Sequence, residues 1–528
     1  MNGFARAMFA PFLIIAIAVL EPTRVVAQGH VHDGLGTVHF ATSCAPATTA
    51  QFDRSIALLH SFEFGAAIAG FQNVLATDST CAMALWGIAL SRWTNPMAPG
   101  VRPPALLSRG RDAAGRAARL SAAATPRERS YVTAVGALYD DYEHRDQPSR
   151  VAAYERAMAE LVQREPADTE AKIFHAISLV AAAPPTDKTY ANQLRAGATL
   201  EALWKAQPDH PGLAHYIIHA YDVPPLASRA SDAAKRYAEI APAAAHALHM
   251  PSHTFTRLGL WESSVDANRR SADVALRDSS VAEALHASDY MEYAYLQMRR
   301  LSDAKAVLDG LPALAARFDP NAVTGAAPGS AGIFALAAIP ARYALERQAW
   351  ADAAALAPKT TSVPYADAMT WFARALGGVH AKRLDEAHTA VDSLATFRDR
   401  LTAQGESYWA EQVAIQRLGA EAWLALANGR RDAALATMSE AARREDATEK
   451  SAVSPGPLAP ARELLADMLL QLERPAEARA EYERTLEKEP NRFRALDGAR
   501  SAALAVGDRR AASAYAARIA ALTGERKP

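Results

Sequence analysis

The feature that most constrains this sequence is an arrangement of small and large residues near its C-terminal end, in the stretch LLADMLLQLERPAEARAEYERTLEKEP. Leu465 and Ala466 fall where a first helix would pack. Ala478 and Tyr482 follow at the spacing of a second helix, which Pro490 ends. Two helices cross closely at small residues while large residues fill the gap, and proline stops a helix. Such pairs bury their apolar faces by stacking on neighbouring pairs, so we expect an all-α chain.

Weaker copies of the same pattern occur along the rest of the chain. Ala67 and Phe71 lie in a predicted second helix, and Leu258 and Gly259 lie at a predicted turn between helices. The pattern resembles the tetratricopeptide (TPR) repeat, a helix-turn-helix unit of about 34 residues. The resemblance implies a TPR-like α-solenoid of roughly nine or ten helix-turn-helix pairs.

Longer strings carry a second resemblance. The strings TVHFATSC, ALLHSFEF, CAMALWGIAL and ALHMPSHTFTRLGLW are similar to those of a poorly characterised group of exported bacterial TPR-containing proteins. The resemblance covers about half of the chain, from about His39 to about Leu296, with generic TPR units beyond it. It implies the fold and export from the cytoplasm, and it implies no reaction.

The first residues predict the compartment. Arg6 precedes an uncharged apolar run over residues 7–20, and small residues end at Ala27. This order is typical of a secretory signal peptide cleaved after Ala27. The alternative is an uncleaved membrane anchor, for which the run is short. No later stretch is apolar enough to span a bilayer, so we expect a periplasmic or secreted protein with no stable membrane span after cleavage.

Composition shifts divide the chain further. Two Pro-rich stretches, 94–104 and 451–460, predict loops, and a stretch rich in Gly, Ala and Pro predicts a linker. The expected order is a signal peptide (1–27), a flexible His-containing segment (28–47), N-terminal and middle TPR-like repeats (48–318), a linker (319–332) and C-terminal TPR repeats (333–528). After cleavage His30 would be the third residue, where it can complete a square-planar Cu(II) or Ni(II) site, although a polar tail is the simpler interpretation.

The histidines are concentrated in the middle of the chain. His215 with His219, and His249 with His253, have the i,i+4 spacing that puts two rings on one helix face. The second pair follows the first by 34 residues, one repeat length, and His286 extends the row. Asp222 and Asp289 are near in sequence, where a carboxylate can complete a ligand set or orient an imidazole.

Two interpretations of this row are open. The first is a metal or ligand site shared by adjacent repeats, holding a divalent transition metal. The second is packing, since repeat proteins reuse a core residue at the same place. Neither pair is an H-E-x-x-H motif, and Pro251 inside HMPSH lies either in the first turn of a helix or at a break in the pair. His60, between large apolar residues, is expected to be a core histidine.

Cys44 and Cys81 are the two cysteines of the chain. An oxidising compartment permits a disulfide between them, and the alternative is a thiolate metal ligand or nucleophile.

The function expected from these features is an exported scaffold that binds a protein or peptide in a concave groove. The alternative is a metal-binding protein or metalloenzyme built on the histidine row. The formal net charge of −1 argues against a nucleic-acid partner, because such binders usually carry a basic excess. Motifs of known catalytic classes, such as G-x-S-x-G or a Walker-type loop, are absent, so the sequence does not predict an enzyme.

Overall fold

The computed structural model describes residues 1–3, 34–98 and 100–524. Gly34–Pro528 forms one compact unit. The predicted signal peptide, apart from its first three residues, and the predicted site at His30 lie outside the described residues.

The N-terminal and middle helices follow one another with short connections. Their bounds are α1 (Thr49–His60), α2 (Phe64–Thr77), α3 (Ala82–Trp93), α4 (Pro104–Leu120), α5 (Pro126–Ala137), α6 (Gln147–Arg164), α7 (Thr169–Ala181), α8 (Ala191–Trp204), α9 (Pro211–Ala220), α10 (Ser231–Ile240), α11 (Ala245–His249), α12 (Pro251–Arg257), α13 (Trp261–Arg277), α14 (Val281–Gln297) and α15 (Leu301–Ala315). Three single 3₁₀ turns accompany them: η1 (Pro46–Thr48), η2 (Ser121–Ala123) and η3 (Ala227–Ala230).

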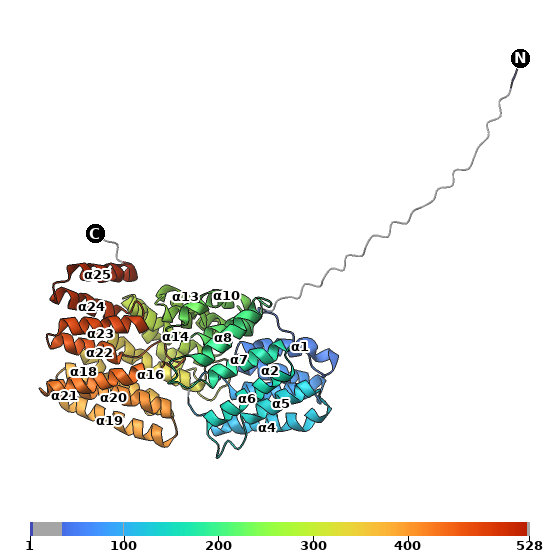
Figure 1. The fold of residues 1–528 in the computed structure, drawn as a ribbon, viewed down its shortest axis with the longest axis horizontal. Helices are drawn as coiled ribbons and strands as arrows, with labels where there is room; N and C mark the ends of the chain where they lie inside the picture. Colours follow the sequence, from blue (N-terminus) through green and yellow to red (C-terminus); the bar gives the residue numbers. More distant parts are fainter. Residues whose placement is uncertain (4–33, 99, 525–528) are drawn as a thin grey trace. The chain divides into compact units, whose positions relative to one another are not determined.

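The remaining helices continue the same alternation. Their bounds are α16 (Gly329–Glu346), α17 (Trp350–Ala355), α18 (Pro364–His380), α19 (Leu384–Ala403), α20 (Ser407–Ala427), α21 (Arg431–Asp446), α22 (Ala461–Gln471), α23 (Pro475–Lys488), α24 (Phe493–Ala505) and α25 (Arg509–Thr523). Within Gly34–Pro528, α1–α6 lie at one end of the array, α18–α25 at the other, and α8–α16 between them (Figure 1).

These helices form antiparallel pairs that stack in chain order, and no β-strand occurs in the described part of the chain. The expected all-α, TPR-like α-solenoid is confirmed. The helices of the described residues group into twelve pairs when α11 and α12 are counted as one helix interrupted at Pro251, which is more than the nine or ten pairs expected. Proline at the start of α9, α12 and α23 fits this order, because its missing N–H would be unpaired there in any case.

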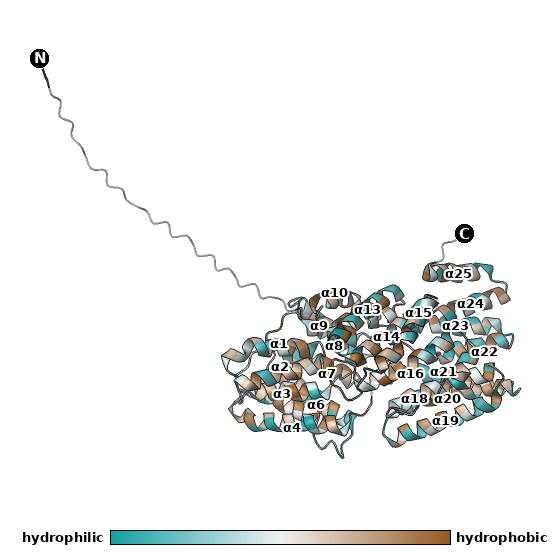
Figure 2. Ribbon diagram, turned by 180° about the vertical axis from the view of Figure 1, so that it is seen from behind, coloured by the Kyte–Doolittle hydropathy of each residue, from teal (hydrophilic) through white to brown (hydrophobic). Residues whose placement is uncertain are grey.

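Tight helix crossings use glycine against an aromatic ring. A Cβ on Gly498 would lie 2.2 Å from the ring of Tyr482, and one on Gly87 would lie 2.4 Å from the ring of Phe71. Hydrophobic and hydrophilic residues alternate along single helices (Figure 2), as amphipathic packing requires. The buried apolar residues gather mainly in two cores, one N-terminal and one C-terminal, with a polar zone over α11–α14 between them.

The predicted linker 319–332 contains the loop after α15 and the first residues of α16. This loop crosses back to the start of the chain, where Gly65 N–H donates to the Thr324 carbonyl at 2.8 Å. The predicted loop 451–460 also turns inward, and its Gly456 and Pro457 carbonyls accept hydrogen bonds from Arg342. Both loops therefore connect helices that are far apart in sequence.

Residues 34–47 are ordered, contrary to expectation. They belong to the segment expected to be flexible, yet Leu35, Val38 and Phe40 are buried in the N-terminal core. Phe40 packs against Phe52, Trp86 and Tyr131, which explains why the backbone is held.

Across the residues that the structure describes, no helix combines the length and the apolar character that a bilayer crossing demands.

Cys44 Sγ and Cys81 Sγ are joined, closing a loop across a sequence separation of 37. We expect Cys44→Ser to destabilise the oxidised protein by roughly 4 kcal/mol, because the cross-link limits the unfolded chain. Thermal unfolding with and without a reductant measures this effect. The reductant should lower the melting temperature of the unaltered protein and leave that of the variant unchanged; equal melting temperatures for both oxidised proteins would contradict the prediction.

Candidate metal centre

The histidine row lies on the first helices of three consecutive pairs. Helix α9 carries His215 and His219, the interrupted helix α11–α12 carries His246, His249 and His253, and α14 carries His286. All six side chains are between 0% and 6% exposed. The 34-residue spacing therefore does place the two i,i+4 pairs on neighbouring inner helices, as a repeat array requires.

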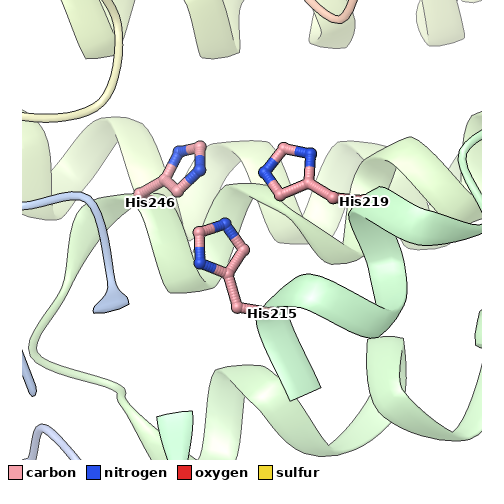
Figure 3. Close-up of side chains that lie close together, drawn as sticks. All are labelled: His215, His219 and His246. Carbon is pink, nitrogen blue, oxygen red and sulfur yellow. The ribbon is translucent and has the colours of Figure 1, made fainter. Parts of the chain in front are cut away.

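The row separates into two groups of three rather than one group of four. Each i,i+4 pair takes its third ring from the first helix of the next helix pair. His215 and His219 meet His246, and one ring nitrogen of each lies within 4.8 Å of the others (Figure 3). We call these three residues the first triad. The sequence did not single out His246, although it lies one helical turn before His249 and therefore on a similar face.

In two rings of the first triad, hydrogen bonds show which nitrogen is left without a partner. His215 Nδ1 lies 2.6 Å from the carbonyl oxygen of His60. A carbonyl only accepts, so Nδ1 carries the proton and Nε2 presents its lone pair. His246 Nδ1 lies 3.1 Å from Glu283 Oε1, so its Nε2 is the nitrogen that points away from this carboxylate. The Nε2 atoms of His215, His219 and His246 are buried, and none has a hydrogen-bond partner among the described residues.

The second triad consists of His249, His253 and His286, again with one nitrogen of each within 4.8 Å of the others. His249 Nε2 and His253 Nε2 are 3.0 Å apart. Pro251 lies in the first turn of α12, where it interrupts the helix without separating the two rings. The rings of His246 and His249 are stacked at 5.9 Å between centroids, so the two triads are neighbours.

A third group of buried titratable residues, His60, Glu170 and His210, is hydrogen-bonded within itself, and only His210 Nδ1 lacks a partner among the described residues. Glu170 accepts from His60 Nε2 at 2.8 Å and from His210 Nε2 at 2.9 Å. His60 Nδ1 lies 3.1 Å from the hydroxyl of Tyr216. His60 is therefore a core histidine with both nitrogens paired, and its backbone carbonyl holds His215 in place.

The two candidate carboxylates have different surroundings. Asp222 Oδ2 accepts from His253 Nδ1 at 2.8 Å, so it orients an imidazole, one of the two roles expected of it. Asp289 instead pairs with Arg342 at 3.3 Å, and both side chains are fully buried. No contact of Asp289 with a histidine of the row is found in the described part of the chain. Asn268 on α13 and Glu283 on α14 also orient rings of the row, since they accept from His249 Nδ1 and His246 Nδ1. Neither residue carried a recognisable sequence signal.

Burial determines the charge state of the row. Desolvation by burial, reinforced by neighbouring histidines, lowers the pKa of His215, His219 and His249 well below the usual range. The same desolvation lowers the pKa of His286 to about 3. Burial also opposes ionisation of Asp222, but Lys450 and Arg257 outweigh it and hold the pKa of that carboxyl well below its ordinary value. His215, His219, His249 and His286 are therefore neutral imidazoles at neutral pH, the form that binds metals.

Both triads open onto one cavity of about 40 Å³, which His219, His246, His253 and His286 line together. The remaining wall includes residues of all three irregular stretches of the sequence, together with Met250, Tyr365 and Trp409. The residues from the irregular stretches are Asn95, Ala98, Ala326, Ala327, Pro328, Ser330, Ala331, Ala452 and Val453. A larger cleft of about 760 Å³ is also lined by residues 326–328 and Ser330, which it shares with the small cavity. It extends along residues 100–109 and 401–406. The interruptions of the repeat pattern thus form most of the surroundings of the histidines.

Comparisons with known proteins give no family assignment. No family model matches the chain, and no curated protein matches it. Among solved structures, yeast Tom70 is 13% identical with a TM-score of 0.36, covering 88% of this chain and 96% of that one. A human IFIT1 dimer with m7Gppp-AAAA is 10% identical with a TM-score of 0.39, covering 92% of this chain and 96% of that one.

One expectation about partners was wrong. The expectation of no nucleic-acid partner rests on the net charge alone. A near-neutral total charge does not report the charge of a single site within a long array, so that exclusion does not hold. The chain is a TPR-like helical repeat protein with six histidines gathered inside it.

Proposed function

We propose that this protein binds a divalent transition metal ion through His215, His219 and His246. The observation that carries the proposal is the set of three buried Nε2 atoms, close together and without hydrogen-bond partners among the described residues. A buried polar atom without a partner costs about 1–3 kcal/mol, so three at one point are unfavourable unless a ligand binds them.

The chemistry of the three ligands favours Zn²⁺ or a neighbouring first-row ion. Neutral imidazole nitrogens suit zinc, copper and nickel, and three of them leave a fourth position open. His219 and His246 line the cavity, so that position would face it. The contacts of His215 with a carbonyl and of His246 with a carboxylate match the outer partners that usually orient metal-binding histidines.

The packing interpretation accounts less well for these rings. His60, in the same interior, shows what a packing histidine does here, because both of its nitrogens have partners. The first triad instead directs its free nitrogens at one another, an arrangement without hydrogen bonds between them.

Metal analysis of the full chain, purified without a histidine tag, tests the proposal. After incubation with Zn²⁺ and gel filtration, His215→Ala should retain about one ion fewer per chain than the unaltered protein. His388→Ala, which removes an exposed histidine on α19, is the matched control and should retain the full content. Equal zinc content in the His215 variant and the unaltered protein would refute the site.

A scaffold role is the second candidate. The cleft of about 760 Å³ is the observation that favours it, because a groove of this size between α4, the 320–333 segment and α19 can hold a peptide. A pull-down with the unaltered protein and with Val101→Glu, an exposed apolar residue of this cleft, would test it. A partner lost in the variant supports the role, and a partner retained equally by both proteins excludes this cleft.

We also propose that the protein works in a periplasm or outside the cell. The N-terminal apolar run and the paired cysteines both favour export to an oxidising compartment. Cell fractionation, with N-terminal sequencing of the mature chain, tests this; an intact N-terminus in the cytoplasmic fraction would contradict it.

A further inference from the structure

The second triad has its own hydrogen-bond pattern, which can be followed atom by atom. Asn268 Nδ2 donates to the carbonyl of Ser264 at 2.7 Å, so the other end of that amide is its oxygen. Asn268 Oδ1 lies 2.6 Å from His249 Nδ1. The oxygen can only accept, so His249 carries its proton on Nδ1.

His253 is fixed in the same way from the opposite side. Its Nδ1 lies 2.8 Å from Asp222 Oδ2, and the Asp222 carboxylate also accepts from Arg257 Nε at 2.9 Å. A carboxylate held by a guanidinium accepts hydrogen bonds, so His253 donates from Nδ1. Both Nε2 atoms then present lone pairs to each other across 3.0 Å, and no proton lies between them.

Other donors do not resolve this contact. The hydroxyl of Tyr290 lies 3.4 Å from His253 Nε2, but it is closer to the carbonyls of Ala452 at 3.1 Å and Ser454 at 3.2 Å. A second proton on either ring would place a charge where His249 is 0% and His253 is 1% exposed, which is costly. Two facing lone pairs repel unless a cation binds both.

The separation of the two atoms fits a shared metal ion. Two ligand nitrogens of a tetrahedral zinc ion, each about 2.0–2.1 Å from the metal, are about 3.3 Å apart. The observed 3.0 Å differs from this by a few tenths of an ångström. His286 supplies the third nitrogen within 4.8 Å, and its ring centroid lies 4.5 Å from that of His249.

We infer that His249, His253 and His286 form a second, independent site for a divalent transition metal ion. The two ions would lie beside one cavity, because each triad contributes two of its rings to the same wall. A cavity of about 40 Å³ admits only water or a small anion, so the ligand shared by two such ions belongs to that class. This inference goes beyond the proposed function, which concerns the first triad alone.

Crossed variants separate the two sites. With Co²⁺ as the probe, the unaltered protein should bind about two ions per chain, with the visible absorption of four-coordinate cobalt. His249→Ala should lose one ion and keep the one at His215, whereas His215→Ala should lose one and keep the other. The double variant should bind none tightly.

A milder change protects the test against misfolding. Asn268→Ala removes only the acceptor that orients His249. It should lower the affinity for one of the two Co²⁺ ions about 10- to 100-fold and leave the affinity for the other unchanged. Binding of one ion by the unaltered protein, unaffected by His249→Ala, would overturn the second site while preserving the first. Loss of one ion in His249→Ala with an unchanged content in His215→Ala would overturn the first and keep the second.

Discussion

Lowering the pH from about 7.5 to about 5 should sharply reduce the stability of the metal-free protein. Burial holds the pKa values of His215, His219 and His249 well below 6.5, and that of His286 at about 3. In the unfolded chain the pKa of each of these rings returns to about 6.5. Below that pH the unfolded chain takes up protons on these rings, while the folded protein does not. Each such ring therefore costs about 1.4 kcal/mol of stability per pH unit below 6.5.

The sign of the effect is fixed by which state binds more protons. Below about 6.5 the unfolded state binds more, so the free energy of unfolding falls as the pH falls, down to the pKa of each folded ring. Urea titrations of chelator-treated protein at several pH values measure this slope. His219→Leu should flatten the slope by about 1.4 kcal/mol per pH unit, and His388→Leu, at an exposed position, should not change it. A urea midpoint independent of pH between about 7.5 and 5 would contradict neutral buried rings.

Replacing Arg492 by alanine should destabilise the protein by about 3–5 kcal/mol. Arg492 is fully buried and contacts Glu463 through Nε at 2.7 Å and Nη2 at 3.0 Å. Its Nη1 lies 2.7 Å from Glu346 Oε1. Removing the guanidinium takes a positive partner away from two buried carboxylates. A buried charge without its partner lowers the stability of the fold far more than an intact buried ion pair does.

A matched control lies on α24, the helix for which Arg492 is the N-cap residue. Arg500 pairs with Asp497 at 2.7 Å, and both side chains are more than a third exposed. Exposed pairs contribute about 0–1 kcal/mol, so Arg500→Ala should leave the urea midpoint almost unchanged. Equal midpoints for the two variants would show that the buried network around Arg492 does not stabilise the C-terminal half.

The fold was predictable because its signal is local. The small residues, glycines and prolines that set each helix crossing recur at repeat spacing, so their pattern can be read without knowing long-range contacts. The i,i+4 histidine pairs were found for the same reason. Apart from His286, their partners were not found: His246 joins His215 and His219 from α11, and Asn268 and Glu283 belong to α13 and α14.

The cavity also could not be predicted from the periodicity of the sequence. Apart from the histidines, most of its wall lies near residues 95, 326 and 452, outside the repeat pattern, and Tyr365 and Trp409 come from the distant helices α18 and α20. Where such loops fold depends on the curvature of the whole array, and single-sequence spacing does not report that curvature.

The inward loop after α15 has a consequence for folding. In an open solenoid each repeat touches only its neighbours, so the ends can unravel and the array melts in steps. Here the Thr324 carbonyl is bonded to Gly65, and Ala327 N–H donates to Glu283, which ties the first pair of helices to the middle of the chain. Contacts between residues so distant in sequence form late and slowly. The array should therefore gain its central cavity only when the middle repeats close on the first, and lose it in a single cooperative step rather than by fraying from either end.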